Sequence, residues 1–364
     1  MESDVTRHGA AASGERWEVP QAFDAVFDSG FASGRRELIA LYEKGKQRQW
    51  DASVRIDWSQ PLDPENPQQL PAEALPLHGA PFLDRMSGRE RAEIFRHYQA
   101  WSVSQFLHGE QGALLCAAKI VQQVPDGDAK LYAATQVIDE ARHVEAYKRL
   151  LEKFGVSYAV TGPLRELLDQ VLRDARWDMT YLGMQVVVEG LALAAFAAIR
   201  DTAQNPLAAS VNAYVMEDEA RHVAFGRLAL RDFYPQLTEA ERSEREEFVV
   251  EACHLMRGRF DAAELWRTLD LPAKECVEYV DASESRQAFR AMLYSRIVPA
   301  VKDIGLWGPR IRKAYAQMGI LGFAQVPLDV LQASDETIAR ELDARRRYVE
   351  RTAGLGEPGS GASG

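Results

Sequence analysis

The pentapeptide Asp-Glu-Ala-Arg-His occurs twice in this chain, at residues 139–143 and 218–222. Each copy holds a Glu-x-x-His, and residues three apart on a helix project from the same face. A further glutamate stands thirty positions before the glutamate of each copy, within an apolar segment. A buried carboxylate is costly unless it is paired or binds a metal. The pattern therefore predicts a site for two metal ions, with the ligands Glu110, Glu140, His143, Glu189, Glu219 and His222.

In each repeat, a turn signal lies midway between the upstream glutamate and the glutamate of the pentapeptide. Residues 125–128 (Pro-Asp-Gly-Asp) separate the first glutamate from the first pentapeptide, and residues 204–206 (Gln-Asn-Pro) do so in the second half. Antiparallel helices around each turn would hold each glutamate level with its Glu-x-x-His partner. Four helices would then converge on one site, as in ferritin-like di-iron and di-manganese carboxylate proteins. The pattern predicts a duplicated helical hairpin.

Other occurrences of these residue types fit the pattern less well. A single Asp-Glu-Ala-Arg-His would also suit a solvent-exposed salt-bridge face. The doubling, with a matched upstream glutamate each time, favours metal binding. A third Glu-x-x-His, at Glu251 and His254, has no such glutamate and falls on a fifth helix, so we expect an outer packing role there. His108 is two residues from Glu110 and points away from its face.

Composition narrows the class of protein. The chain has 364 residues and a formal charge of −11, with no basic cluster that would suit nucleic acid. No apolar run approaches a membrane span of about 20 residues and no signal-peptide pattern is present, which predicts a cytoplasmic protein with no membrane contact. Three widely spaced cysteines, Cys116, Cys253 and Cys276, do not suggest a disulfide framework.

The patterning predicts an all-α chain: a ferritin-like four-helix bundle carrying a dinuclear metal site, with additional flanking helices. We expect a disordered N-terminus (1–16), an N-terminal extension (17–87) with a helix near 35–49, the bundle (88–262), a C-terminal helical extension (263–353) and a flexible tail (354–364). Long helices are expected at 88–124, 127–154, 163–203, 207–233 and 239–262, and shorter ones near 283–297, 307–318 and 335–352. No convincing strand pattern or glycine-rich phosphate loop occurs.

Hard carboxylates with two imidazoles suit iron or manganese better than zinc. Two of the carboxylates can bridge the metals while the rest cap them, which leaves positions for dioxygen. Asp139 and Asp218 precede the ligating glutamates and are candidate acceptors for the imidazole N–H groups, and Arg142 and Arg221 can pair with these aspartates. The alternative for these four residues is ordinary helix-surface charge.

The doubled motif with its upstream glutamates resembles the di-iron oxygenases of the ferritin-like superfamily. Relatives include multicomponent monooxygenase hydroxylases, ribonucleotide reductase small subunits, acyl-carrier-protein desaturases and arylamine N-oxygenases. The resemblance covers 88–262, and residues 42–51 are similar to an N-terminal segment of the oxygenase branch. It implies a non-heme enzyme with two Fe ions (Mn being possible) that uses O2, an electron donor such as a ferredoxin or a flavin reductase, and a homodimer.

Three positions depart from particular branches. Tyr147 stands where reductase small subunits keep a radical tyrosine, although a packing role is the commoner one for such a residue. The hydroxylase threonine one turn past the third-helix glutamate is replaced by Leu193. The extra histidine ligand of the N-oxygenase branch is replaced by Val215, which weakens an N-oxygenation assignment without excluding it.

The predicted reaction is oxidation of a small, apolar or aromatic organic substrate, by hydroxylation, N-oxygenation or desaturation. The alternatives are a ferroxidase or iron-handling protein, and a radical-generating oxidase that uses Tyr147. Residues near the ligands along the helices are expected to line the substrate pocket, although ordinary core packing would also explain them. They are Phe106, Gly109, Ala113, Ala117, Gln185, Leu193 and Phe196.

Overall fold

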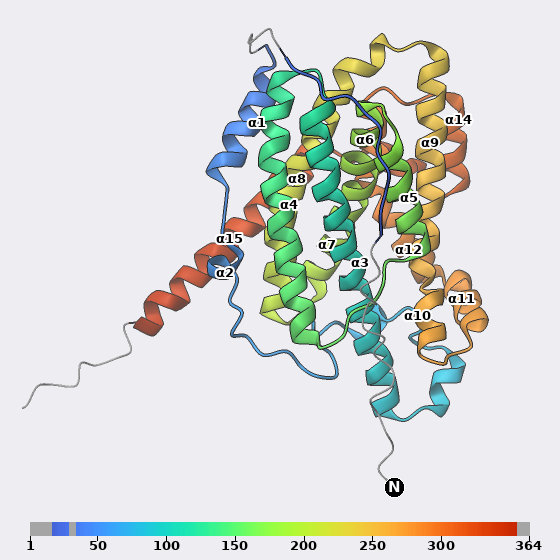
Figure 1. Cartoon of the computed structure of the whole chain (residues 1–364). Helices are drawn as coiled ribbons and strands as arrows, with labels where there is room; N and C mark the ends of the chain where they lie inside the picture. The colour runs from blue at the N-terminus through green and yellow to red at the C-terminus, as the bar shows by residue number, and fades with distance from the viewer. Residues whose placement is uncertain (1–16, 29–33, 355–364) are drawn as a thin grey trace, which may run out of the picture.

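The computed structural model describes residues 17–28 and 34–354, and every regular element in these ranges is helical. Two helical hairpins form its centre (Figure 1). The first joins α3 (Gly88–Gln123) to α4 (Gly127–Phe154). The second joins α7 (Glu189–Thr202) to α8 (Pro206–Phe233), and α4 packs against α8. The all-α, ferritin-like fold predicted from the repeat is confirmed.

Both predicted turns begin the helices that carry the pentapeptides. The Asp126 side chain caps α4 by accepting a hydrogen bond of 3.0 Å from the backbone N–H of Ala129. The Asn205 side chain caps α8 by accepting from the N–H groups of Leu207 and Ala208. Such caps satisfy N–H groups that have no partner inside the helix. The tight turns therefore set each pentapeptide level with its upstream glutamate.

The helix expected at 163–203 is not continuous, and this prediction was wrong. α5 (Gly162–Arg173) ends first, and α6 (Trp177–Tyr181) begins after a break. The buried Lys119 side chain donates to the backbone carbonyls of Val171, Leu172 and Asp174 at 3.0, 3.0 and 2.6 Å. These bonds satisfy carbonyls at the end of α5, which a continuing helix would have used. The break comes from a lysine distant in the sequence.

A π-helical segment, η4 (Leu182–Val188), leads directly into Glu189. A π-turn holds more residues than an α-turn, so α-helical spacing does not apply to residues before Glu189. The Gln185 side chain faces α8, where a Cβ added at Gly226 would lie 2.6 Å from the Cβ of Gln185. Glycine at 226 allows this close approach.

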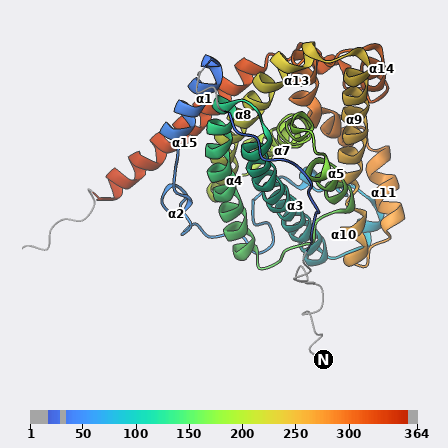
Figure 2. The same ribbon diagram turned by 45° about the horizontal axis from the view of Figure 1, so that its top comes forward.

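Further helices surround the bundle, some of them on the opposite side from α1 and α15 (Figure 2). The helix expected at 239–262 ends at Gly258, the one near 283–297 is divided, and the one near 335–352 begins at Leu328. The remaining elements are α1 (Arg36–Gln47), α2 (Ala52–Arg55), η2 (Ala72–Ala74), η3 (Pro81–Arg85), η5 (Tyr234–Gln236), α9 (Glu239–Gly258), η6 (Arg259–Asp261), α10 (Ala263–Thr268), α11 (Ala273–Ala282), α12 (Glu284–Met292), η7 (Leu293–Ser295), α13 (Ile297–Asp303), α14 (Pro309–Gln317), η8 (Leu321–Gln325) and α15 (Leu328–Gly354). The expected disorder at 1–16, and the expected tail beyond Gly354, lie outside the described residues.

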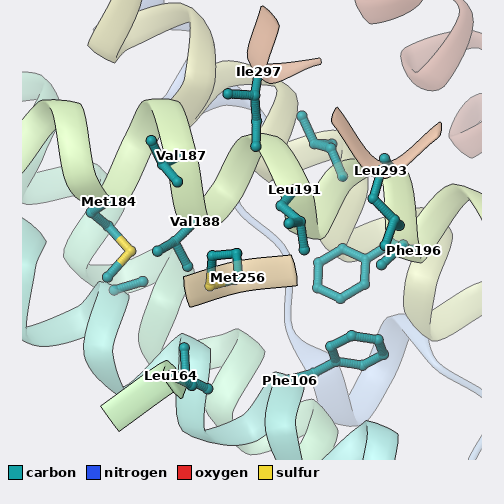
Figure 3. Close-up of a cluster of buried hydrophobic side chains, with 14 of the residues drawn as sticks. Phe106, Leu164, Met184, Val187, Val188, Leu191, Phe196, Met256, Leu293 and Ile297 are labelled. Carbon is teal, nitrogen blue, oxygen red and sulfur yellow. The ribbon is translucent and has the colours of Figure 1, made fainter. Parts of the chain in front are cut away.

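The second hairpin contains the most apolar stretch of the described chain. Trp177–Thr202 is long and apolar enough to span a membrane by composition, with a mean hydropathy of 1.9, but 78% of its window is buried inside the protein. This is the pattern of a core helix. Leu191 and Phe196 of this stretch pack with Phe106 of α3 and with Leu293 and Ile297 from the C-terminal region (Figure 3). The apolar cluster lies beside Glu189 on α7.

Candidate metal centre

Four helical segments bring the six predicted ligands together in the core. Glu110 comes from α3, Glu140 and His143 from α4, Glu189 from the start of α7, and Glu219 and His222 from α8. All six are buried. Their donor atoms form two groups, each with atoms within 4.8 Å of one another. The first contains Glu110, Glu140, His143 and Glu219, and the second contains Glu140, Glu189, Glu219 and His222. Glu140 and Glu219 belong to both groups.

The imidazole Nδ1 atoms face these carboxylates. His143 Nδ1 lies 3.0 Å from Glu219 Oε1 and 3.3 Å from Glu110 Oε2. His222 Nδ1 lies 3.1 Å from Glu140 Oε1 and 3.5 Å from Glu219 Oε2. His143 therefore approaches Glu219, which both groups share, and Glu110, which belongs to the first group alone. His222 approaches Glu140 and Glu219, which both groups share. This is the donor arrangement that a pair of metal ions bridged by two carboxylates requires.

Each histidine is oriented by the aspartate of the other repeat. His143 Nε2 lies 3.1 Å from Asp218 Oδ2, and His222 Nε2 lies 3.2 Å from Asp139 Oδ2. Because Nε2 is engaged by the aspartate, the Nδ1 of each ring is directed at the carboxylate cluster. Hydrogen bonds of this kind fix the tautomer and the orientation of a metal-binding imidazole. The crossed pairing follows from the packing of α4 against α8.

Two buried arginines pair with these aspartates. Arg142 Nη2 lies 2.5 Å from Asp139 Oδ1 and 2.8 Å from Asp218 Oδ2. Arg221 donates to Asp218. The two positive charges balance the two aspartates. Ordinary surface charge, the alternative for these four residues, does not describe side chains that are at most 6% exposed.

Three further residues that contact the site, Gln49, Trp50 and Gln136, were missed by the sequence analysis. Gln49 donates to Asp139 Oδ1 at 2.7 Å and accepts from Arg142, and Trp50 Nε1 donates to Asp218 Oδ2 at 2.8 Å. Gln136 donates to Glu140 Oε1 and to Glu189 Oε1, both at 3.0 Å. The position of Gln136, four residues before Glu140 on one helix face, was an available signal. Nothing local in the sequence places the segment of Gln49 and Trp50 over the site.

The residues present fit a pair of divalent metal ions. Four glutamates share the site, and the nearest arginines are already engaged by aspartates, so four negative charges remain to be balanced. Among the described residues, several buried donor atoms here lie in close contacts at most and form no hydrogen bond of normal geometry: Glu140 Oε2, Glu189 Oε2, both carboxylate oxygens of Glu219, and His222 Nδ1. Unpaired buried polar atoms are rare because they lose hydration without compensation. Two ions with a total charge of +4 would satisfy both requirements.

The electrostatics of the metal-free site predict that metal binding displaces protons. Burial and nearby Glu219 raise the pKa of Glu110, and burial with Glu219 and Glu140 raises that of Glu189. Burial alone would lower the pKa of His143, but contacts with carboxylates raise it well above its usual value. The same holds for His222. Protons therefore occupy donor atoms that the metals need.

We expect metal loading of the metal-free protein at neutral pH to release protons. Groups with raised pKa values hold their protons at neutral pH, so acidification strengthens the competition and lowers metal affinity. The measurement is anaerobic addition of Fe(II) to weakly buffered protein with a pH indicator, repeated at several pH values. An affinity that does not change as the pH falls would contradict this expectation.

An inner cavity borders the site, and an outer cavity adjoins the inner one. The inner one, of about 20 Å³, borders Glu110, Glu189 and Glu219. The outer one, of about 470 Å³, is lined by α3, α7, the N-terminal extension and α12. Gln105, Phe106 and Arg259 line both. Of the expected pocket residues, the inner cavity is lined by Phe106, Gly109, Ala113 and Phe196, whereas Ala117, Gln185 and Leu193 are outside its lining.

The helix geometry explains these three exceptions. Gln185 lies in the π-helical segment and donates at 3.5 Å to Gln136 on the far side of the ligands. On α7 the cavity is lined by Leu191, Ala192 and Phe196, which lie to one side of Glu189 around the helix, whereas Leu193 lies on its other side. Ala117 is fully buried in packing. The three residues were predicted to line the pocket from their α-helical spacing to the ligands. This spacing does not take account of the π-turn or of where the neighbouring helices lie.

The other residues considered in the sequence analysis belong to neither group of donor atoms. Glu251 and His254 are exposed on α9, as expected for an outer helix. His108 Nε2 is 2.8 Å from the carbonyl oxygen of Tyr158. Tyr147 is fully buried, packs between Phe106 and Phe196, and donates to Asn212 Oδ1 at 3.3 Å. Burial and the nearby carboxylates raise its pKa.

Several solved structures of other proteins are similar to this chain. Among solved structures, an R2-like ligand-binding oxidase with its metal cofactor after photoconversion is 16% identical, with a TM-score of 0.51 over 74% of this chain and 94% of that chain. A mutant of such an oxidase with a Mn/Fe cofactor is 17% identical, with a TM-score of 0.50 over the same shares. An aldehyde deformylating oxidase from Synechococcus is 18% identical, with a TM-score of 0.47 over 62% of this chain and 97% of that chain. The first two share the fold of this chain.

No curated protein sequence matches the chain significantly. The sequence model of the family described as P-aminobenzoate N-oxygenase AurF matches residues 34–305, which include both hairpins. The match therefore covers all six predicted ligands and most of the flanking helices. The chain belongs to the P-aminobenzoate N-oxygenase AurF family, and it is a ferritin-like oxidoreductase that uses dioxygen with a di-iron cofactor.

Proposed function

We propose that Glu110, Glu140, His143, Glu189, Glu219 and His222 bind the two metal ions, with Glu140 and Glu219 bridging them. The shared membership of these two glutamates in both donor groups supports the bridging role. Glu110 with His143, and Glu189 with His222, then cap one metal each. Asp218 and Asp139 hold the imidazoles in the required orientation from behind.

The proposed reaction is oxidation of a small organic substrate whose reacting group enters the inner cavity. When bound, the metal pair supplies the binding and reductive activation of dioxygen. The protein positions the substrate and excludes water, because Phe106, Leu191 and Phe196 make one side of this cavity apolar. The observation that carries the proposal is a cavity bordered by Glu110, Glu189 and Glu219 on one side and by apolar side chains on the other.

N-oxygenation of an aromatic amine is the first reaction to test, because the matching family model is that of a P-aminobenzoate N-oxygenase. Hydroxylation and desaturation are the other two reactions of this class. Reduced, metal-loaded protein is exposed to air with aromatic amines, and with matched aromatic compounds that lack the amine, and the products are identified by mass spectrometry. Oxidation of added Fe(II) alone, with every organic compound recovered unchanged, would instead support the ferroxidase alternative.

Filling the inner cavity should separate substrate oxidation from metal binding. Ala192→Phe places an aromatic ring where only about 20 Å³ is free, so we expect organic oxidation to fall at least ~100-fold while two metals are retained. Metal content and product yield are measured on the same sample. Ala240→Phe, at an exposed position of α9, is the matched control and should keep both. Full product yield from Ala192→Phe would place the reaction elsewhere.

We further propose a homodimer that is reduced by an external donor such as a ferredoxin or a flavin reductase. Leu115 of α3 and Leu131 and Ile138 of α4 are large apolar side chains that are 53, 45 and 57% exposed. An outer face of this kind is suited to contact with a second copy. Light scattering of the wild-type protein and of Leu131→Lys with Ile138→Lys tests the dimer.

A further inference from the structure

Arg259 differs from the other buried arginines of the described chain. Five of them pair with a carboxylate: Arg142, Arg221, Arg245, Arg290 and Arg296. Arg259, in η6, is 7% exposed, and no carboxylate pairs with its guanidinium within the ranges that the structure describes. Burial lowers its pKa to about 10, which still leaves it charged at neutral pH. A buried charge without a counter-ion is costly.

Arg259 lies where a bound molecule could contact it. It lines both the inner and the outer cavity, together with Gln105 and Phe106. The ring of Phe260 lies 5.8 Å from its guanidinium carbon, which supports the side chain without neutralising it. A planar guanidinium matches a carboxylate through paired hydrogen bonds. An anion at the junction of the two cavities would therefore supply the missing partner.

The outer cavity contains a second buried group without a partner. Gln68 is 0% exposed, and neither atom of its side-chain amide has a hydrogen-bond partner within the described chain. Its backbone is held in place, because its N–H donates to Gln99 Oε1 at 2.9 Å and its carbonyl accepts from the N–H of Asn205. The side chain adjoins the cavity and offers one donor and one acceptor. Both amide atoms are covered by protein, so the side chain would turn towards the cavity to contact a polar group of a bound molecule.

We propose that Arg259 binds the carboxylate of the substrate at the junction of the two cavities, and that Gln68 binds a polar group on the outer part of the same molecule. The inference rests on the proposed function, because the oxidised group of that molecule must reach the inner cavity. The inner cavity, of about 20 Å³, takes only a small group, whereas the outer one, of about 470 Å³, holds a much larger part. The substrate class is thus an organic acid whose carboxylate lies between a short apolar arm and a longer polar arm.

Equilibrium binding to metal-loaded enzyme tests this directly. The probes are two matched pairs, propionate with propionamide, and N-acetylalanine with its primary amide, whose short apolar arms suit the inner cavity. In each pair the shape is kept and the charge is removed. We expect the wild-type enzyme to bind each acid at least ~10-fold more tightly than its amide, as for a buried charge-assisted contact. Arg259→Met should remove this preference, and Arg259→Lys should keep part of it.

Two further variants locate the contacts. Gln68→Leu should weaken N-acetylalanine by about 5- to 10-fold and leave propionate unchanged, because the smaller acid does not extend into the outer cavity. Arg310→Met is the control, since that arginine is exposed and forms an ion pair with Glu247 on the surface. It should leave every affinity unchanged.

Thermal unfolding of the ligand-free protein excludes a purely structural role. Arg259→Met removes an uncompensated charge and should raise the Tm, whereas loss of a structural arginine would lower it. A lowered Tm with an unchanged acid preference, or equal affinity of the wild-type enzyme for acid and amide, overturns the inference. Selective acid binding by an enzyme that oxidises no organic compound would reject the proposed function and leave the inference standing. Oxidation of neutral compounds with no effect of Arg259→Met would reject the inference and leave the proposed function standing.

Discussion

Replacing Glu219 with alanine is expected to reduce the bound metal from two ions to less than one per chain, and to lower dioxygen-dependent oxidation at least ~100-fold. Glu219 belongs to both donor groups, so its loss removes one oxygen from each metal position. The Glu219 carboxylate also lies against both imidazoles, at 3.0 Å from His143 and 3.5 Å from His222. Metal content by elemental analysis and oxygen consumption on the same preparation are the measurements.

A matched control and a stability measurement distinguish ligand loss from misfolding. The exposed Glu251 also heads a Glu-x-x-His, and Glu251→Ala should keep two metals per chain. In the metal-free protein Glu219 adds to the repulsion among buried carboxylates, as its effect on the pKa values of Glu110 and Glu189 indicates. Metal-free Glu219→Ala should therefore still unfold cooperatively, because relief of this repulsion offsets part of the lost contact with the two imidazoles. Two tightly bound metals in this variant would contradict the ligand assignment.

Replacing Asp218 with alanine is expected to lower the free energy of unfolding by about 3–5 kcal/mol. Asp218 lies against Arg142, Arg221, His143 and Trp50. Its removal leaves Arg221, which is fully buried, without its nearest counter-ion. Denaturant unfolding of the metal-free variant and of the wild-type protein gives the difference. The comparison is made without metal so that changed metal affinity does not contribute.

The pH dependence gives a second check on the same residue. Burial opposes ionisation of Asp218, but Arg221, His143 and Arg142 together hold its pKa well below the usual value. A lowered carboxyl pKa in the folded state contributes stability at neutral pH that is lost as the pH falls through that pKa. The wild-type and Asp218→Ala proteins should therefore converge in stability in acid. Asp303→Ala, at the exposed pair with Arg227, is the control and should cost at most about 1 kcal/mol.

The residues that meet in the candidate metal centre could be predicted because their information is local and repeated. Glu140 with His143, and Glu219 with His222, need only the helical period, and the turns at 125–128 and 204–206 give the register with the upstream glutamates. Burial adds the requirement for metal, because carboxylates in apolar segments need a counter-charge. The sequence by itself therefore determined the all-α hairpin duplication and the residue types that meet in its core.

The surroundings of the ligands were decided by tertiary structure, since they depend on contacts between segments distant in the chain. Lys119 ends α5 through carbonyls more than fifty residues away, and the π-turn before Glu189 changes the direction of Gln185. The crossing of Asp139 and Asp218 to opposite histidines requires α4 against α8. Periodicity within one helix describes which face a residue occupies, but not which helix that face meets. For this reason Arg259, the unpaired charge between the two cavities, became visible only in the folded chain.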